Sequence, residues 1–217
     1  MRNLPRLRLV VYDLDGTLID SRADLADSVN AMLARMDLPT HEQRVVIGFV
    51  GEGAERLIRR SLGPQHEHRY SEAAPIWAEE YGARLLHKTK LYDGIDELLQ
   101  LPPELRAVLT NKPGRFAREI LQGLGVAKSF ARVVGGDEGP RKPSPDWLLR
   151  LCRELHADAA ETLLVGDSAV DVSTGKAAGV PICAVTYGMG ERASLTAADY
   201  LCDTPAQVAE LLQKLAS

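Results

Sequence analysis

The sequence predicts an α/β fold in which a parallel β-sheet core carries an inserted, all-helical domain. From residue 91 onward, short apolar runs alternate with helical stretches, which is the pattern of parallel strands joined by helices. Between the first apolar run, residues 7–12, and the second, residues 106–110, lies a long block whose pattern is helical. We therefore predict a core domain of residues 1–19 and 91–217 and a helical domain of residues 20–90.

The helical block begins with an amphipathic stretch over residues 25–36. Its apolar side chains recur at helical spacing, at Leu25, Val29, Met32, Leu33 and Met36. Asp20 or Ser21 is expected to cap this helix at its N-terminus. Further helices are predicted over residues 42–50, 54–62 and 67–86, with a break at Gly63-Pro64. Because Pro75 lies inside the last window, we expect a kink or a split there.

The second half of the chain supplies the other elements of the core. Strands are predicted over residues 106–110, 132–135, 162–167, 181–186 and 200–202. Helices are predicted over residues 95–101, 116–124, 145–155, 170–178 and 206–215. Gly125 and Gly179 follow two of these helices directly and are typical C-terminal cap residues. An insertion that enters after the first strand lies over the strand ends, where open α/β sheets bind ligands.

Composition and charge exclude several classes of protein. Apolar residues make up 45% of the 217 residues, and no stretch approaches the roughly 20 apolar residues that a transmembrane helix needs. The net charge of −4 gives no electrostatic case for binding nucleic acid. No long apolar region follows the basic opening, residues 1–6, so a cytoplasmic location is expected. The three cysteines, Cys152, Cys183 and Cys202, fit neither a disulfide framework nor a zinc site and are expected to be reduced and buried.

Two carboxylates stand one residue apart directly after the first strand. Asp13 and Asp15 lie in the run of residues 13–18, Asp-Leu-Asp-Gly-Thr-Leu, and an extended chain projects both to the same side. At an effective dielectric constant of about 20, two unit charges about 4 Å apart repel by about 4 kcal/mol. A shared proton, a hydrogen-bonding shell or a hard divalent cation is needed to offset this repulsion. The alternative is that both aspartates only form a turn before Gly16.

Further polar residues follow the other predicted strands. They are Thr110 and Asn111 after the second strand, Lys142 after the third, and Asp167 and Asp171 after the fourth. The strand ends of a doubly wound sheet converge on one edge, so these residues are expected to meet Asp13 and Asp15. Four carboxylates around one point predict a hard cation with oxygen ligands, and Mg²⁺ suits the role because it leaves positions for water and a substrate phosphate. Thr110, Asn111 and Lys142 supply the donor groups that a phosphate needs, so the pattern predicts a phosphoryl-transfer site.

The same motifs, in this order, resemble those of the haloacid dehalogenase superfamily of hydrolases. They are residues 13–18, Thr110-Asn111, Lys142-Pro143, and Gly166-Asp167-Ser168 followed by Asp171. The resemblance covers essentially the whole chain, and it implies a Rossmann-like parallel-sheet core with residues 20–90 as a helical cap. Within the superfamily, residues 50–53, 92–94 and 186–190 are most similar to phosphoglycolate phosphatase-like members.

The resemblance also implies a role for each residue. Asp13 is expected to attack phosphorus and form an aspartyl-phosphate, and Asp15 to act as general acid and then general base. Thr110, Asn111 and Lys142 are expected to bind the phosphoryl group. The expected metal ligands are Asp13, the main-chain carbonyl of Asp15, Asp167, and Asp171 directly or through water.

Several alternatives stay open at this point. The expected activity is hydrolysis of a small phosphorylated metabolite, with 2-phosphoglycolate as the leading candidate, by a monomer or a homodimer. The same site could serve a phosphomutase, a pyrophosphatase or a sugar-phosphate phosphatase, and a non-catalytic binding protein on this fold is a further possibility. Haloacid dehalogenation is disfavoured because that chemistry does without the second aspartate, and Asp15 is present. The pair His66 and His68, and the arginines Arg56, Arg59 and Arg60, are interpreted as solvated helix positions.

Overall fold

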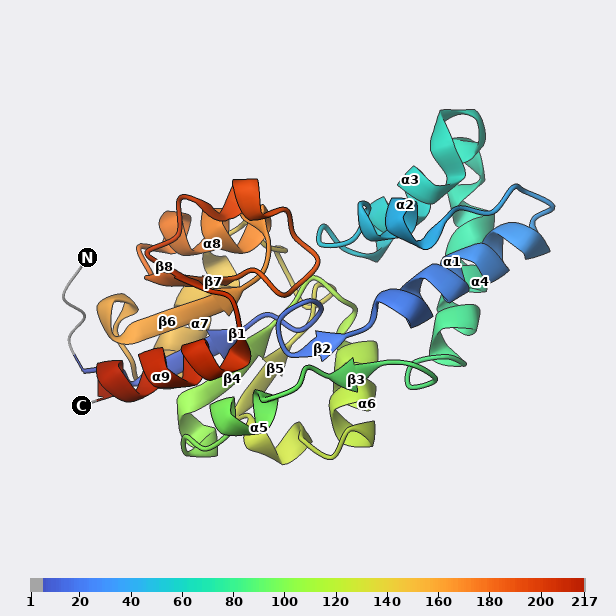
Figure 1. Ribbon diagram of the computed structural model, residues 1–217. Coiled ribbons are helices and arrows are strands. Elements are labelled where there is room, and N and C mark those ends of the chain that lie inside the picture. Colours follow the sequence, from blue (N-terminus) through green and yellow to red (C-terminus); the bar gives the residue numbers. More distant parts are fainter. Residues whose placement is uncertain (1–5, 217) are drawn as a thin grey trace.

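The computed structural model describes residues 6–216, so residues 1–5 and 217 of the predicted core domain lie outside the described residues. Within residues 6–216, six parallel strands form one sheet in the order β5-β4-β1-β6-β7-β8 (Figure 1). The strands are β1 (Leu9–Tyr12), β4 (Arg106–Leu109), β5 (Arg132–Val134), β6 (Thr162–Gly166), β7 (Ile182–Val185) and β8 (Tyr200–Cys202). The predicted α/β fold with a parallel sheet is therefore confirmed.

Strand β1 lies at the centre of the sheet and marks the point where the strand order changes direction. Tyr12, its last residue, is in register with Val108 of β4 on one side and with Val165 of β6 on the other. The chain that leaves β1 therefore emerges between the ends of β4 and β6. Such a switch point is where open α/β sheets bind their ligands.

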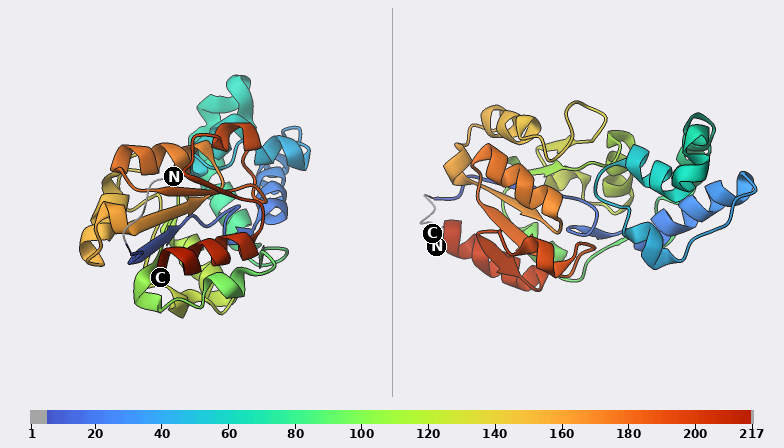
Figure 2. Two further views of the ribbon diagram at one scale, coloured as in Figure 1. Left: turned by 60° about the vertical axis from the view of Figure 1, so that its left-hand side comes forward. Right: turned by 90° about the horizontal axis from the view of Figure 1, so that it is seen from above.

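Helices cover both faces of the sheet (Figure 2). Alternate residues of β1 serve the two sides, because Val10 and Tyr12 belong to one apolar cluster and Leu9 and Val11 to the other. The first cluster is completed by α5 (Ile95–Leu98), α6 (Gly114–Gly123) and α9 (Pro205–Ala216). The second is completed by α7 (Asp146–Glu154) and α8 (Ala169–Ala178). Cys152, Cys183 and Cys202 are free and buried, as predicted.

The inserted block forms a separate group of helices beyond the carboxyl ends of the strands (Figure 1). Its elements are α1 (Arg22–Arg35), α2 (Gln43–Ile47), α3 (Ala54–His66), the 3-10 helix η1 (Glu67–Arg69) and α4 (Tyr70–Gly82). Residues 48–50 and 83–86, which were predicted to be helical, lie outside α2 and α4. We refer to residues 22–82 as the cap helices.

The split that was one of the two outcomes expected at Pro75 is wrong, because α4 continues through this residue. Pro75 removes one helical N–H, whose acceptor would be the carbonyl of Ser71. Both residues are exposed, so water can bind that carbonyl and the helix tolerates the proline. The break predicted at Gly63-Pro64 is confirmed: α3 is kinked at Gly63, whose φ of 70° is accessible to glycine at little cost.

A short antiparallel ribbon joins the cap helices to the core, and sequence patterning missed it. Strand β2 (Ile19–Asp20) pairs with β3 (Lys90–Leu91), so the chain enters and leaves the cap side by side. Two-residue strands carry no periodic signal, which is why they escaped prediction. The predicted domain boundaries at 19/20 and 90/91 fall inside this ribbon.

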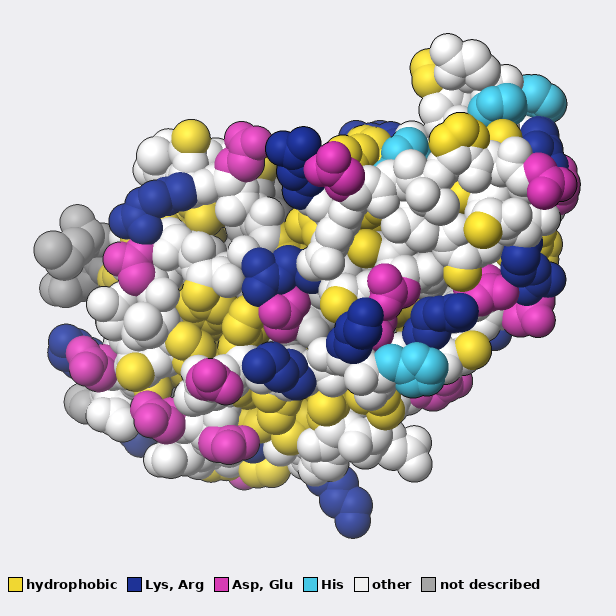
Figure 3. Space-filling model, turned by 45° about the vertical axis from the view of Figure 1, so that its right-hand side comes forward, with side chains coloured by type: hydrophobic (Ala, Val, Ile, Leu, Met, Phe, Trp, Pro, Cys, Tyr) yellow, Lys and Arg dark blue, Asp and Glu magenta, His cyan; other side chains and the backbone are white. Residues whose placement is uncertain are grey.

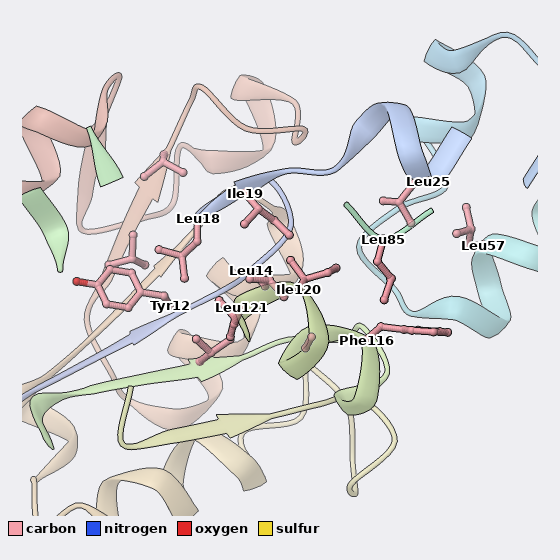
Figure 4. Close-up of a cluster of buried hydrophobic side chains, with 14 of the residues drawn as sticks. Tyr12, Leu14, Leu18, Ile19, Leu25, Leu57, Leu85, Phe116, Ile120 and Leu121 are labelled. Carbon is pink, nitrogen blue, oxygen red and sulfur yellow. The ribbon is translucent and has the colours of Figure 1, made fainter. Parts of the chain in front are cut away.

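Buried contacts hold the two parts together beyond the ribbon. Leu25 and Leu57 of the cap helices and Leu85 belong to the same apolar cluster as Phe116 and Ile120 of α6 (Figure 4).

The surface is mixed in charge: on the face shown in Figure 3, basic and acidic side chains are interspersed. Among the described residues, no helix combines the length and the apolar character that crossing a membrane requires.

Asp24 of α1 provides a test of the junction between the cap helices and the segment that returns to the core, residues 88–89. Its buried Oδ2 accepts hydrogen bonds from the main-chain N–H groups of Lys88 and Thr89, at 2.9 and 2.8 Å, and from the Thr89 hydroxyl at 2.8 Å. Asp24→Ala would leave these buried donors without an acceptor, so we expect the free energy of unfolding in urea to fall by about 2 kcal/mol. Asp27→Ala is the matched control, since Asp27 contacts Lys88 at the surface and is expected to contribute less than about 1 kcal/mol. Equal losses in the two variants would contradict a special role for Asp24.

Candidate active site

A cleft lies between the carboxyl end of the sheet and the cap helices. It encloses about 670 Å³, part of it open to solvent. The core side contributes polar residues, namely Asp13, Asp15, Thr110, Asn111, Lys112 and Asp167. The cap side contributes apolar residues, namely Leu25, Ile47, Val50, Ala54, Leu57 and Trp77. Five of the seven residues predicted to form a site therefore line one cleft. Lys142 contacts one of them, Asp13, and Asp171 contacts Lys142.

Three buried carboxylates meet at the floor of this cleft. One oxygen from each of Asp13, Asp167 and Asp171 lies within 4.8 Å of the others. Asp13 follows β1 directly and Asp167 follows β6 directly, so their proximity results from the pairing of these two strands. Burial raises the pKa of Asp167 to about 8, and the charges of Asp13 and Asp171 add to the effect. Burial likewise raises the pKa of Asp13 to about 7, against the opposing influence of Lys142.

Lys142 is the counterion built into this cluster. Its Nζ lies 2.9 Å from Oδ1 of Asp13 and 2.6 Å from Oδ1 of Asp171, and the side chain is only 2% exposed. Burial lowers the pKa of Lys142, but the two carboxylates outweigh burial and raise it above its usual value. The ammonium group therefore stays charged and offsets part of the repulsion among the aspartates.

Asn111 lines the cleft, and its side chain supports Lys142. Its side-chain amide pairs with the main chain of Lys142, donating to the carbonyl at 2.9 Å and accepting from the N–H at 2.9 Å. The same Nδ2 donates to the carbonyl of Gly51 in the cap at 2.9 Å. Since both amide hydrogens are used, the side chain of Asn111 has no donor left for a phosphate in this arrangement. The structure therefore adds a role for Asn111 as a support for Lys142, and its binding of the phosphoryl group stays a prediction.

Asp171 also has a structural role in addition to the one predicted. Its Oδ2 accepts from the N–H and the hydroxyl of Ser168, at 3.1 and 2.6 Å, and this capping box begins α8. Its Oδ1 is bonded to Lys142. Both carboxylate oxygens are thus engaged, so Asp171 supports the site by fixing Lys142 and the start of α8.

Gly16 and Gly188, which the sequence analysis did not assign to the site, leave the space that the side chain of Asp167 occupies. A Cβ atom on Gly16, whose φ is +82°, would lie 2.0 Å from Oδ2 of Asp167, and one on Gly188 would lie 2.4 Å from the same atom. Residues 188–190 wrap closely around Asp167, whose Oδ2 accepts from the N–H groups of Met189 at 2.6 Å and Gly190 at 3.2 Å. The signals available in the sequence were Gly16 in the motif of residues 13–18 and the glycine spacing in residues 186–190.

The donor set fits a hard cation. Within the described part of the chain, Oδ2 of Asp13 and Oδ1 of Asp167 accept no hydrogen bond, whereas their partner oxygens are held by Leu14 and Lys142 and by residues 189–190. Two free carboxylate oxygens in a buried cluster with raised pKa values are an arrangement that a divalent cation stabilises. Asp13 and Asp167 are thus the side chains best placed to hold it.

Asp15 has a different environment from Asp13, although the two are one residue apart. Its Oδ1 lies 2.9 Å from Nζ of Lys112 and accepts from the hydroxyl of Ser21 at 2.5 Å. Ser21 is the N-cap residue of α1, but its side chain makes no capping bond there and serves Asp15 instead. Sequence reasoning missed Lys112 as a site residue, since a lysine after a strand is usually solvated.

The arginines of α3 lie at the surface of the cap, as the sequence analysis interpreted them. Arg56 and Arg60 pair with Glu52, and Arg59 pairs with Glu55 and Glu67, all outside the set of cleft-lining residues. These pairs are partly exposed at the surface, where ion pairs contribute little to stability.

A buried acidic cluster with its own lysine, at the switch point of a parallel sheet and beneath a helical cap, defines a class of hydrolase. The model of the haloacid dehalogenase-like hydrolase family matches residues 10–185, and the chain belongs to this family. The resemblance noted in the sequence is thereby confirmed.

Individual similar proteins indicate the class of enzyme within this family. The chain is 35% identical to a phosphoglycolate phosphatase from Chromobacterium violaceum, over 97% of this chain and 99% of the relative. It is 36% identical to an N-acetylmuramic acid 6-phosphate phosphatase from Pseudomonas putida, over 84% of each chain. Its structure superposes with a TM-score of 0.88 and 29% identity on a protein from Haemophilus somnus described as a predicted phosphoglycolate phosphatase, covering 94% of this chain and 97% of that one. The enzyme class expected from the sequence, a phosphoglycolate phosphatase-like hydrolase, is therefore confirmed.

The raised pKa values give the cation-free protein a pH-dependent stability. Native Asp13 and Asp167 keep protons up to about pH 7 and 8, whereas ordinary aspartates lose them near 3.8, so in this window the native state binds more protons than the unfolded state. We expect the free energy of unfolding to fall by about 4 kcal/mol between pH 6 and pH 8. Urea denaturation in EDTA measures this, and Asp167→Asn should show a smaller decrease. Identical slopes for the variant and the wild type would contradict the assignment.

Proposed function

We propose that this protein is a Mg²⁺-dependent phosphatase that hydrolyses a small phosphate monoester through an aspartyl-phosphate on Asp13. The observation that carries the proposal is the pairing of Asp13 with buried Lys142 at 2.9 Å, which leaves Oδ2 of Asp13 free in the cleft. A carboxylate so placed is a nucleophile for phosphorus, with a cation beside it to offset the charge of the phosphate.

In the first half of the reaction, Oδ2 of Asp13 attacks phosphorus and forms a bond to it. The bond from phosphorus to the leaving oxygen breaks, its electron pair stays on that oxygen, and Asp15 donates a proton to it. Thr110, which is buried and lines the cleft, and Lys142 orient the phosphoryl oxygens.

In the second half, water releases the phosphate. Asp15 takes a proton from a water molecule whose oxygen bonds to phosphorus, and the bond from phosphorus to Asp13 breaks. Inorganic phosphate and the free Asp13 carboxylate result. Asp15 thus returns to its protonated form, ready for the next ester.

Asp13 and Asp167, with the main-chain carbonyl of Asp15, would hold Mg²⁺, and Asp171 would support it directly or through water. Positive charge from such a cation would offset the charge that builds up on the phosphoryl oxygens during transfer. The chain's own contribution is to keep the carboxylates together before the cation arrives, through Lys142 and the N–H groups of residues 189–190.

The leading substrate candidate is 2-phosphoglycolate. The names of several similar proteins support it, since the 35% identical relative is a phosphoglycolate phosphatase. A specific observation favours a second candidate: the cap side of the cleft is apolar, with Ile47, Leu57 and Trp77. Such a wall suits a larger alcohol with an apolar face, such as the N-acetylated sugar 6-phosphate named for the Pseudomonas putida relative.

The proposed organisation follows the predicted domains. Residues 1–19 and 91–217 form the catalytic core, and residues 20–90 form a cap that covers the substrate. We propose that the enzyme acts in the cytoplasm as a monomer or a homodimer on a small phosphorylated metabolite, without nucleic acid or membrane as partner.

Asp13→Asn tests the nucleophile. We expect phosphatase activity to fall at least about 1,000-fold, because the amide cannot form the acyl phosphate. The measurement is kcat/KM with Mg²⁺ over a panel containing 2-phosphoglycolate, N-acetylmuramic acid 6-phosphate and other sugar phosphates. Asp96→Asn, an exposed position on α5, is the control and should match the wild type. Undiminished turnover in Asp13→Asn would exclude Asp13 as the nucleophile.

Asp15→Asn tests the general acid. We expect its kcat/KM to fall about 100-fold or more for an alkyl phosphate, whose leaving alkoxide needs a proton. The loss should be smaller for 4-nitrophenyl phosphate, whose leaving group is stable without one. A comparison of the two substrates checks this expectation, and equal losses on both would assign Asp15 to another role.

A further inference from the structure

One oxygen of Asp15 is anchored from two directions, and the other is left free. Nζ of Lys112 and the hydroxyl of Ser21 both bind Oδ1, at 2.9 and 2.5 Å. Among the described residues no donor reaches Oδ2, and Asp15 lines the cleft. The carboxylate is thereby held in one orientation, with Oδ2 as the atom available for proton transfer.

Lys112 is itself held by a residue of the cap. The hydroxyl of Tyr81, in α4, lies 2.5 Å from Nζ of Lys112, and Nζ lies 4.6 Å from the centre of the Tyr81 ring. Burial raises the pKa of Tyr81 to about 12, so the hydroxyl is protonated at neutral pH and accepts from the ammonium group. Tyr81 thus joins the cap to the acid/base group of the core through one lysine.

The position of Tyr81 is fixed by aromatic packing across the junction. Its ring stacks on Trp77 of the same helix, with centroids 5.1 Å apart, and meets Phe116 of α6 edge-on, also at 5.1 Å. The tyrosine is fully buried. The hydroxyl reaches Lys112 because α4 is seated against α6, so the contact depends on the placement of the cap.

A buried lysine is costly, and its presence here needs an explanation other than stability. The Lys112 side chain is 3% exposed, and an apolar residue of similar size would avoid the loss of hydration. Lys112 does not contact Asp13, whose counterion is Lys142. Among the side chains of the described residues, the ammonium group of Lys112 has only Asp15 and Tyr81 as partners.

We propose that Lys112 and Tyr81 are positioning residues that hold Oδ1 of Asp15, so that Oδ2 faces the leaving group only while the cap is seated on the core. This inference rests on the proposed role of Asp15 as general acid. When Asp15 releases its proton to the leaving oxygen, the ammonium of Lys112 remains as the ion partner of the resulting carboxylate. When α4 moves away from α6, Lys112 loses Tyr81 and the orientation of Asp15 is no longer fixed.

The test compares an alkyl phosphate with 4-nitrophenyl phosphate, using kcat/KM because it reports the step that forms the phosphoenzyme. Tyr81→Phe removes only the hydroxyl and keeps the ring contacts with Trp77 and Phe116. We expect it to lower kcat/KM about tenfold for the alkyl phosphate and less than about twofold for 4-nitrophenyl phosphate. Tyr70→Phe, in the same helix but stacked on Arg59, is the matched control and should change neither value by more than about twofold.

Lys112→Met shows whether Tyr81 acts through the lysine. This variant should show the same selective loss, and the double variant with Tyr81→Phe should be no worse than Lys112→Met alone. Losses that add up in the double variant, or equal losses on both substrates, would overturn the proposal. If Lys112→Met does not fold, the substrate comparison in Tyr81→Phe decides alone.

The outcomes separate this inference from the proposed function. A wild-type enzyme whose activity depends on Asp13, together with an unchanged substrate ratio in Tyr81→Phe, would leave the phosphatase assignment intact and refute the positioning role. A wild-type protein without activity on any ester of the panel would refute both.

Discussion

The repulsion among buried carboxylates at the end of β1 is the constraint on which the rest of the site depends. Asp13, Asp167 and Asp171 are close enough that burial and mutual repulsion raise the pKa of Asp13 and Asp167. Lys142 offsets part of that repulsion, and its own position needs support from Asn111 and Asp171. Hence residues from four separate strand ends are committed to keeping one negative cluster in place, which is the preorganisation that electrostatic catalysis requires.

Sheet topology determines which strand ends can take part. Because β1 pairs with both β4 and β6, the residues that follow these three strands meet without any long loop, and only Lys142 must be brought in from the more distant β5. A mispaired strand would separate Asp13 from Asp167 at once. The apolar alternation that builds the two cores therefore also places the catalytic groups, so stability and function depend on the same strand register.

Sequence patterning predicted the parallel sheet and the aspartates and lysine at its edge, since strand periodicity and motif order are local signals. It could not predict β2 and β3, which are too short to show a period, or the continuity of α4, which depends on the exposure of Pro75. Asn111 was placed correctly beside the site, but its partners are main-chain groups of Lys142 and Gly51, and no sequence pattern specifies these. Such contacts depend on how distant segments meet.

The two aspartates of the motif after β1 show most clearly how contacts between distant segments distinguish residues that look alike in sequence. In sequence Asp13 and Asp15 are near-equivalent carboxylates, yet each has a lysine of its own, Lys142 for Asp13 and Lys112 for Asp15. The direct partners of the lysine of Asp13 all belong to the core, whereas the lysine of Asp15 is bonded directly to Tyr81 of the cap. A nucleophile must be ready before the substrate enters, but a proton donor is useful only once the leaving group is enclosed. Anchoring Asp13 to the core and Asp15 partly to the cap matches each carboxylate to the stage at which it acts.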